Sequence, residues 1–227
     1  MSDMSAQVRR ALDVAVEAIG GAAREGQIEM AEAVANALTN RHHLMVQAGT
    51  GTGKSLAYLI PGIVHGRKVL VATATIALQR QLVDRDLPAV VPALEKELGR
   101  EISYAIYKGV GNYVCLQKMN SEDVDPDGEL VMEVSSLEKD AKRLIAWAKT
   151  PGVSGDRDDA PEVDRRVWAA NSVSGRECVG ADVCAFGSQC FAANAKAKAQ
   201  TADIVVTNHT LLAIEIVDSH PILPDRD

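Results

Sequence analysis

The stretch Ala48-Gly49-Thr50-Gly51-Thr52-Gly53-Lys54-Ser55 decides the fold of this chain. A short apolar run at 44–46 leads into it, and a helix-like run at 55–60 follows it. A glycine-rich turn between a strand and a helix exposes backbone N–H groups to phosphate oxygens, and the helix N-terminus adds partial positive charge. The pattern predicts a P-loop in which Lys54 reaches the β- and γ-phosphates of a nucleotide and Ser55 holds Mg²⁺.

One position departs from the usual form of this motif, because Ala48 stands where the first glycine is expected. The change is mild, since the alanine side chain is small. The alternative interpretation is a glycine-rich surface turn that binds nothing. Under the P-loop interpretation, the nucleotide-binding positions are Ala48, Gly49, Thr50, Gly51, Thr52, Gly53, Lys54 and Ser55.

The segments around this turn predict an α/β fold with a parallel sheet. Two runs, 68–73 and 203–207, are short and rich in apolar residues without alternation, as expected for strands covered on both faces. The run at 102–107 is interpreted as a third strand. Alternation of strand and helix is typical of βαβ units. The expected helices cover 5–19, 24–38 and 76–82.

The character of the chain changes at Lys108. From there to about Gln200 the sequence shows helices, including one at 137–149, and long polar loops without a clear strand. A sheet domain interrupted by an insert of domain size explains this order most simply. The expected divisions are 1–107 for the first part of the sheet domain, 108–200 for the insert and 201–227 for the return to the sheet domain.

The charge balance limits where nucleic acid could bind. The chain has 227 residues and a net charge of −7, so a basic surface must be a local patch. Residues 108–200 hold 12 Lys/Arg against 15 Asp/Glu. Any strand path there is therefore a narrow track, for which the candidates are Lys108, Lys118, Arg176 and Lys196.

No segment is typical of membrane insertion or export. The apolar runs are shorter than the roughly 18 residues of a membrane span, and the N-terminus lacks an apolar signal core. We therefore expect a cytoplasmic protein with no membrane partner.

The four cysteines, Cys115, Cys178, Cys184 and Cys190, all lie within the expected insert. Five residues separate each of the last three, which fits the C-x₂₋₄-C knuckle of a structural zinc site poorly. Four thiolates can instead ligate a [4Fe–4S] cluster, and disulfides are rare in cytosolic chains. A cluster, a zinc ion and unrelated buried cysteines all remain open from spacing alone.

Four features together resemble the iron–sulfur superfamily 2 helicases of the DinG/XPD type, with the bacterial DinG-like branch as the nearer match. They occur in the family's order over essentially the whole chain. They are Arg24-x-x-Gln27-x-x-Met30, the P-loop, Thr73-Ala-Thr75-x-x-Leu78-Gln79-x-Gln81-Leu82, and Gly111-Asn112-Tyr113-Val114-Cys115 with the three later cysteines and Val206-Thr207-Asn208-His209. The resemblance implies a RecA-like P-loop domain with a mostly helical four-cysteine insert.

The resemblance also implies roles for individual residues. Arg24 and Gln27 would lie near adenine, Lys54 and Ser55 would bind ATP and Mg²⁺, and the four cysteines would hold a [4Fe–4S] cluster. The implied substrate is single-stranded or forked DNA, with 5′-to-3′ unwinding in repair or replication. Backbone contacts to the strand would come from Thr73, Thr75, Gln79 and Asn208. The alternatives are a polar helix start for Arg24 and Gln27, and helix capping and a solvated face for Thr75 and Gln79.

Hydrolysis in this family needs an Asp-Glu-x-His box and a second motor domain. The only similar stretch, 214–220, has Ser219 in place of the glutamate, and we interpret it as a helix and a loop. We therefore expect an incomplete RecA-like domain that requires a missing C-terminal helicase domain for activity. The alternative function is a non-catalytic fragment that binds nucleotide or nucleic acid, or responds to redox state.

Overall fold

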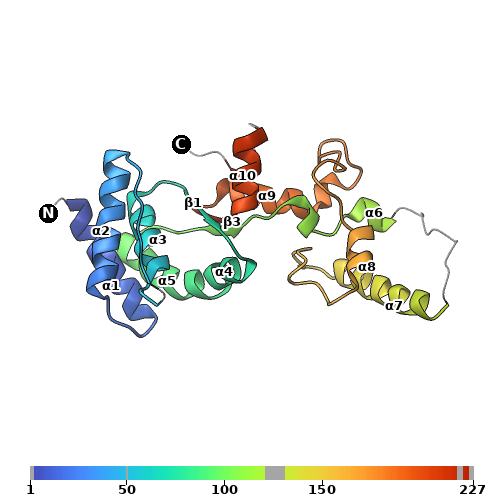
Figure 1. Cartoon of the computed structure of the whole chain (residues 1–227), viewed down its shortest axis with the longest axis horizontal. Helices are drawn as coiled ribbons and strands as arrows, with labels where there is room; N and C mark the ends of the chain where they lie inside the picture. Colours follow the sequence, from blue (N-terminus) through green and yellow to red (C-terminus); the bar gives the residue numbers. More distant parts are fainter. Residues whose placement is uncertain (1–2, 50, 121–130, 219–221, 225–227) are drawn as a thin grey trace. The chain divides into compact units, whose positions relative to one another are not determined.

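A computed structural model describes residues 3–49, 51–120, 131–218 and 222–224. The chain divides into two compact units: unit 1 comprises 1–107 and 198–227, and unit 2 comprises 108–197. Figure 1 colours both units along the sequence. We describe each unit by itself.

Unit 1 is an α/β unit with three parallel strands. Its elements are α1 (Asp3–Ala18), α2 (Glu25–Asn40), α3 (Lys54–His65), β1 (Val69–Thr73), α4 (Ile76–Arg80), the π-helix η1 (Gln81–Asp86), α5 (Leu87–Leu98), β2 (Tyr104–Ile106), β3 (Ile204–Asn208) and α10 (His209–Asp218). The strand order is β1-β3-β2, so the strand latest in sequence lies in the middle. The predicted α/β fold with a parallel sheet is confirmed.

The central strand explains why its sequence is a continuous apolar run. Val69 of β1 pairs with Ile204 of β3, and Tyr104 of β2 pairs with the same Ile204 on the other side. The first four residues of β3 are buried, as expected where a sheet is covered on both faces. The core of unit 1 joins this strand to α1, α3 and α5, and its fully enclosed side chains include Leu12, Leu59, Ile60, Leu87 and Leu94.

The strand predicted at 44–46 does not form. These residues carry no strand assignment, and Met45 is 97% exposed. A β-strand is defined by backbone hydrogen bonds to a neighbour, and the three described strands pair only among themselves. The apolar run therefore leads to the P-loop without pairing to the described sheet.

Unit 2 has a small core of its own. Its elements are the 3₁₀ turn η2 (Val110–Asn112), α6 (Leu116–Asn120), α7 (Val131–Ala148), α8 (Arg165–Ala170), the 3₁₀ turn η3 (Gly187–Gln189) and α9 (Phe191–Thr201), whose last turn belongs to unit 1. Leu144 of α7 is completely buried against Val167 and Trp168 of α8 and Val114. The described residues of unit 2 form isolated β-bridges but no β-strand.

No helix in the described residues is both long enough and apolar enough to cross a membrane.

Candidate nucleotide and cysteine sites

The P-loop turns into α3 through two glycines with positive φ. Gly51 and Gly53 both have φ of +77°, a conformation that residues with a side chain rarely adopt. Lys54 begins α3, and its ammonium donates to the carbonyl oxygens of Ala48, at 3.2 Å, and Gly49. The lysine thus lies in the turn where the phosphates of a nucleotide would bind. Thr50 lies outside the described residues.

Arg24 and Gln27, at the start of α2, both contact the P-loop backbone. An Arg24 guanidinium nitrogen donates to the Gly51 carbonyl at 2.5 Å, and Gln27 Nε2 donates to the Gly53 carbonyl at 3.0 Å. A Cβ added at Gly53 would lie 2.3 Å from Gln27 Nε2. Gly53 therefore provides both the turn conformation and the space for a buried glutamine, which a solvated helix start would not require.

These residues line a cavity of about 600 Å³, within the size range of small-ligand sites. Lys54, Ser55, Arg24 and Gln27 lie on its wall together with Gly51, Thr52 and Gly53. The fold thus brings seven of the predicted nucleotide-binding residues to one cavity, whereas Ala48 and Gly49 do not line it. A further part of the wall comes from α4, η1 and α5 and is formed by Leu78, Gln81, Arg85, Asp86 and Val90. In the sequence, Leu78 and Gln81 were recognised only as motif residues, and none of the five was assigned to the nucleotide site.

The π-helix η1 places an ion pair on that wall. Asp86 accepts hydrogen bonds from Arg85 Nε and from Gln81 Nε2, both at 3.0 Å. Burial raises the pKa of Tyr58, the negative charge of Asp86 raises it further, and a hydrogen bond with Ser55 lowers it in part. Tyr58 is therefore neutral at physiological pH beside the Ser55 hydroxyl. A π-helix is a frequent feature of functional sites, but nothing in the sequence pattern distinguishes it from an α-helix.

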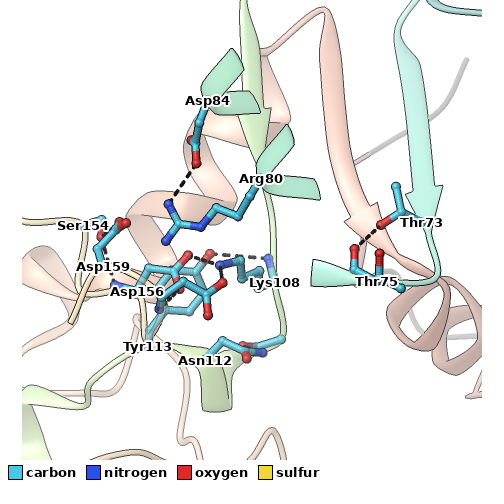
Figure 2. Close-up of polar contacts among 12 residues, drawn as sticks. Thr73, Thr75, Arg80, Asp84, Lys108, Asn112, Tyr113, Ser154, Asp156 and Asp159 are labelled. Carbon is cyan, nitrogen blue, oxygen red and sulfur yellow. Dashed lines mark hydrogen bonds and ion pairs between the residues drawn. The ribbon is translucent and has the colours of Figure 1, made fainter. Parts of the chain in front are cut away.

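The four predicted DNA contacts have different environments. Thr75 is exposed and caps α4 by accepting from the Leu78 N–H, and Asn208 caps α10 by accepting from the Leu211 N–H. Thr73 is buried and donates to the Thr75 carbonyl at 3.0 Å (Figure 2). The helix-capping alternative for Thr75 is confirmed, and capping leaves its side chain at the surface.

Gln79 differs from these residues because its side chain is fully buried. Its amide nitrogen and oxygen have no hydrogen-bond partner within the part of the chain that the structure describes. The solvated face considered for Gln79 is therefore wrong, and a DNA strand at the surface does not reach the side chain in this structure. Buried amides without partners are uncommon in folded proteins.

The four cysteines of unit 2 line a single cavity. The structure places Cys115 before α6, Cys178 and Cys184 in the loop after α8, and Cys190 immediately before α9. All four are free thiols and half-buried. Cys184 Sγ lies 3.4 Å from Gln117 Oε1. The remaining wall is largely apolar and includes Val110, Val173, Val179, Phe186 and Ala192.

This arrangement fits an iron–sulfur group in its donor set. Four thiols face one apolar cavity, as required for thiolate ligation of an iron–sulfur cluster. Among the described residues, no three His, Cys, Asp or Glu side chains are close enough together to hold one metal ion. The fold therefore brings four cysteines, up to 75 positions apart in the sequence, to the wall of one cavity, but it does not bring three of them within the distance at which they could share one metal ion.

Lys108 does not belong to a surface track for DNA. Its side chain is 3% exposed, and its ammonium lies 2.5 Å from a carboxylate oxygen of Asp156 and 2.6 Å from one of Asp158. Lys118 and Arg176 are exposed and Lys196 is half-buried. The expectation for Lys108 is corrected, because a buried and doubly paired cation is not available to phosphate.

Comparison with known proteins matches residues 28–109 to the family described as DEAD/DEAH box helicase. The chain is 50% identical over 98% of its length to an ATP-dependent helicase DinG of Mycobacterium tuberculosis, covering 36% of that protein. It is 38% identical over 86% of its length to the ATP-dependent DNA helicase YoaA of Escherichia coli, covering 29% of it. With the ATP-dependent DNA helicase DinG of the same organism, identity is 30% over 89% of this chain and 30% of the relative. The chain spans about a third of the length of these relatives.

Proposed function

Because this chain belongs to the DinG-type DEAD/DEAH box helicases, we propose that it supplies the ATP-binding part of an ATP-dependent DNA helicase. The observation that carries the proposal is the cavity of unit 1, where Arg24, Gln27, Lys54 and Ser55 converge. Lys54 binds the β- and γ-phosphates, Ser55 holds Mg²⁺, and the Gln27 amide and Arg24 lie near the adenine.

In this proposal, the phosphates of ATP replace the backbone carbonyl oxygens that Lys54 contacts within the P-loop. Lys54 Nζ now contacts the carbonyl oxygens of Ala48 and Gly49, and phosphate oxygens would become its partners when nucleotide binds. The Gly51 and Gly53 carbonyls are already occupied by Arg24 and Gln27. These contacts preorganise the turn, which reduces the ordering cost of binding.

The test is Mg²⁺-dependent binding of a fluorescent ATP analogue to the 227-residue chain. Lys54→Ala should weaken binding by about 10- to 100-fold, the range for a charged hydrogen bond lost from a site. Lys96→Ala is the matched control, because Lys96 is exposed on α5 and does not line the cavity. Equal affinity of the Lys54→Ala and Lys96→Ala chains would refute the P-loop assignment.

We further propose that the insert at 108–200 holds a [4Fe–4S] cluster through Cys115, Cys178, Cys184 and Cys190. The supporting observation is that all four thiols line one cavity with apolar walls. Such a cluster supplies a rigid cross-link among four chain segments and a site for electron transfer when it is bound. The chain's own residues provide the thiolates and exclude water around them.

Metal analysis tests this assignment directly. The chain purified without oxygen should contain iron and acid-labile sulfide in equal amounts, and Cys178→Ser should remove most of both. Ser188→Ala, an exposed change in the same loop region, should keep them. Stoichiometric zinc without iron would instead establish the zinc alternative.

The substrate and the direction of movement rest on the family resemblance alone. We propose single-stranded or forked DNA as the substrate, 5′-to-3′ unwinding in repair or replication once a second motor domain is present, and a cytoplasmic location. Thr75 and Asn208 are the proposed strand contacts that the structure leaves accessible. A chain joined to its second motor domain should unwind a fork with a 5′ tail, and unwinding only from a 3′ tail would reverse the proposed direction.

A further inference from the structure

A buried cation stands at the first residue of unit 2. Lys108 is 3% exposed and its ammonium lies 2.5 Å from a carboxylate oxygen of Asp156 (Figure 2). A carboxylate oxygen of Asp158 lies 2.6 Å from the same ammonium. The Asp156 side chain is only 6% exposed, whereas that of Asp158 is 26% exposed. Burying charge is costly unless the geometry of the pair is good and the remaining lone pairs are satisfied. The other carboxylate oxygen of Asp156 accepts from the Asp158 N–H at 3.0 Å, which satisfies one of them.

This ion pair holds the loop at 154–159 against the segment that leads to Cys115. Tyr113 forms an antiparallel bridge with Asp156. The Arg157 N–H donates to the Asn112 carbonyl at 2.8 Å, and the Val114 N–H donates to the Gly155 carbonyl at 3.0 Å. The backbone from 112 to 114 is therefore fixed on one side by the loop that carries both carboxylates.

The same segment is fixed on its other side by the end of α8. Val114 bridges Ser172, and the Cys115 N–H donates to the Asn171 carbonyl at 2.8 Å. Trp168 Nε1 donates to the Gly111 carbonyl at 3.0 Å. Cys115 thus emerges from a backbone held on both sides before it reaches the cysteine cavity.

The loop itself is fitted closely to α9. Gly155 has φ of +69°, and a Cβ at this position would lie 2.2 Å from the Phe191 ring. Phe191 follows Cys190 directly. A side chain at position 155 would therefore displace either the loop that supports Cys115 or the helix start beside Cys190.

We propose that Lys108 and Asp156 are positioning residues that set the place of the Cys115 thiol in the cysteine cavity. The ion pair acts through the bridge between Tyr113 and Asp156, and neither charged group lines the cavity. The functional consequence rests on the proposed cluster. The positioning role does not, because it concerns the position of one thiol in the chain without metal.

Thiol alkylation of the metal-free chain, resolved by residue with mass spectrometry, tests this role. Lys108→Met leaves the buried Asp156 carboxylate without its cation, so the loop should detach from 112–114. The alkylation rate of Cys115 should rise by roughly tenfold or more, since losing one partner of a buried pair costs more than a tenfold change requires. Rates at Cys178, Cys184 and Cys190 should change less than twofold.

Two further variants control the experiment. Arg143→Met removes a cation whose side chain is 54% exposed, together with its ion pair to Asp140 and its hydrogen bond to the Glu162 carbonyl, and should leave all four rates unchanged. Asp156→Asn keeps the side-chain volume and leaves Lys108 paired with Asp158, so it should give a smaller rise confined to Cys115. This variant decides the matter if Lys108→Met fails to fold.

A parallel rise at all four cysteines in the Asp156→Asn chain, or no rise at Cys115, would overturn the proposal. After reconstitution with iron and sulfide, Lys108→Met should also hold iron about 10- to 100-fold more weakly against a chelator, as when a group that orients a metal ligand is removed. A wild-type chain that takes up no iron would refute the cluster while leaving the alkylation result to decide the positioning role.

Discussion

The nucleotide site of unit 1 and the cysteine site of unit 2 are assembled in opposite ways. The predicted phosphate-binding part of the nucleotide site comes from consecutive residues, of which 51–55 line the cavity, and the turn conformation is encoded locally by Gly51 and Gly53. The cysteine site comes from four positions between 115 and 190, and no local motif fixes their separation. A local motif carries its geometry with it, whereas dispersed ligands depend on the fold around them.

The long-range supports of the two units are also different in kind. In unit 1, Ser103 and Asp203 join the chain segments that precede and follow the insert in the sequence. An Asp203 carboxylate oxygen accepts hydrogen bonds from both the backbone N–H and the hydroxyl of Ser103, each at 2.7 Å. In unit 2, the corresponding long-range support is the buried contact of Lys108 with Asp156. The first support is partly exposed and the second is enclosed, so we expect unit 2 to be more sensitive to loss of its support.

The largest predicted effect is a loss of stability in the core of one unit that leaves the other unit intact. Leu144→Ala should destabilise unit 2 by about 2–5 kcal/mol, since it empties a fully buried position in a small core. Limited proteolysis should then cut within 108–197 while ATP-analogue binding persists. Iron uptake should fall, because the ligands are held by that core.

Leu59→Ala is the matched substitution in unit 1, because Leu59 is 1% exposed in the other core. It should weaken nucleotide binding and leave the susceptibility of unit 2 to protease unchanged. If either leucine variant abolished both activities to the same degree, the two sites would share one cooperative fold and the comparison would break down.

A smaller effect concerns the locally encoded turn. Gly53→Ala should cost about 1–3 kcal/mol of stability from its positive φ and should also weaken ATP binding, because the new methyl group displaces the Gln27 amide. Gly51→Ala has the same φ but no atom within 4 Å of the added Cβ. Thermal unfolding and ATP titration of both chains isolate the contribution of Gln27, and identical behaviour would show that its contact with Gly53 is immaterial.

The sequence predicted what short-range chemistry specifies. The P-loop residues, the three strands at 68–73, 102–107 and 203–207, and most helices near them follow from glycine placement and apolar periodicity. The prediction of a strand at 44–46 was wrong. An apolar run alone does not make a strand, because a strand also needs a neighbouring strand whose backbone groups are free to form hydrogen bonds.

The sequence did not predict which individual polar residues are buried. Gln79 and Lys108 are polar residues beside long loops or helix starts, where exposure is the usual outcome. Both are instead buried, and the carboxylates that contact Lys108 come from far along the chain. Asp156, for example, is 48 positions from Lys108. An ion pair between residues so far apart can be recognised only when the pairing of Tyr113 with Asp156 is known.

The smallest predicted effect tests the exposed support of unit 1 through pH. Burial alone would raise the pKa of Asp203, but hydrogen bonds from Ser103 and the charge of Arg100 outweigh it and hold the pKa below the ordinary value of 3.8. A lowered pKa in the folded state means that the carboxylate contributes stability above that value and loses it as the pH falls through the folded-state pKa. Because the Asp203 side chain is 38% exposed, the contribution should be below about 1 kcal/mol.

Urea unfolding of the wild-type and Asp203→Asn chains across pH measures this contribution. The two stabilities should differ by a constant small amount at neutral pH and converge below a pH of about 4. Glu101→Gln, an exposed change near the same strand, should give no such convergence. A difference for Asp203→Asn that grew as the pH fell would mean that the carboxylate is protonated more readily in the folded chain, so that burial outweighs the Ser103 hydrogen bonds.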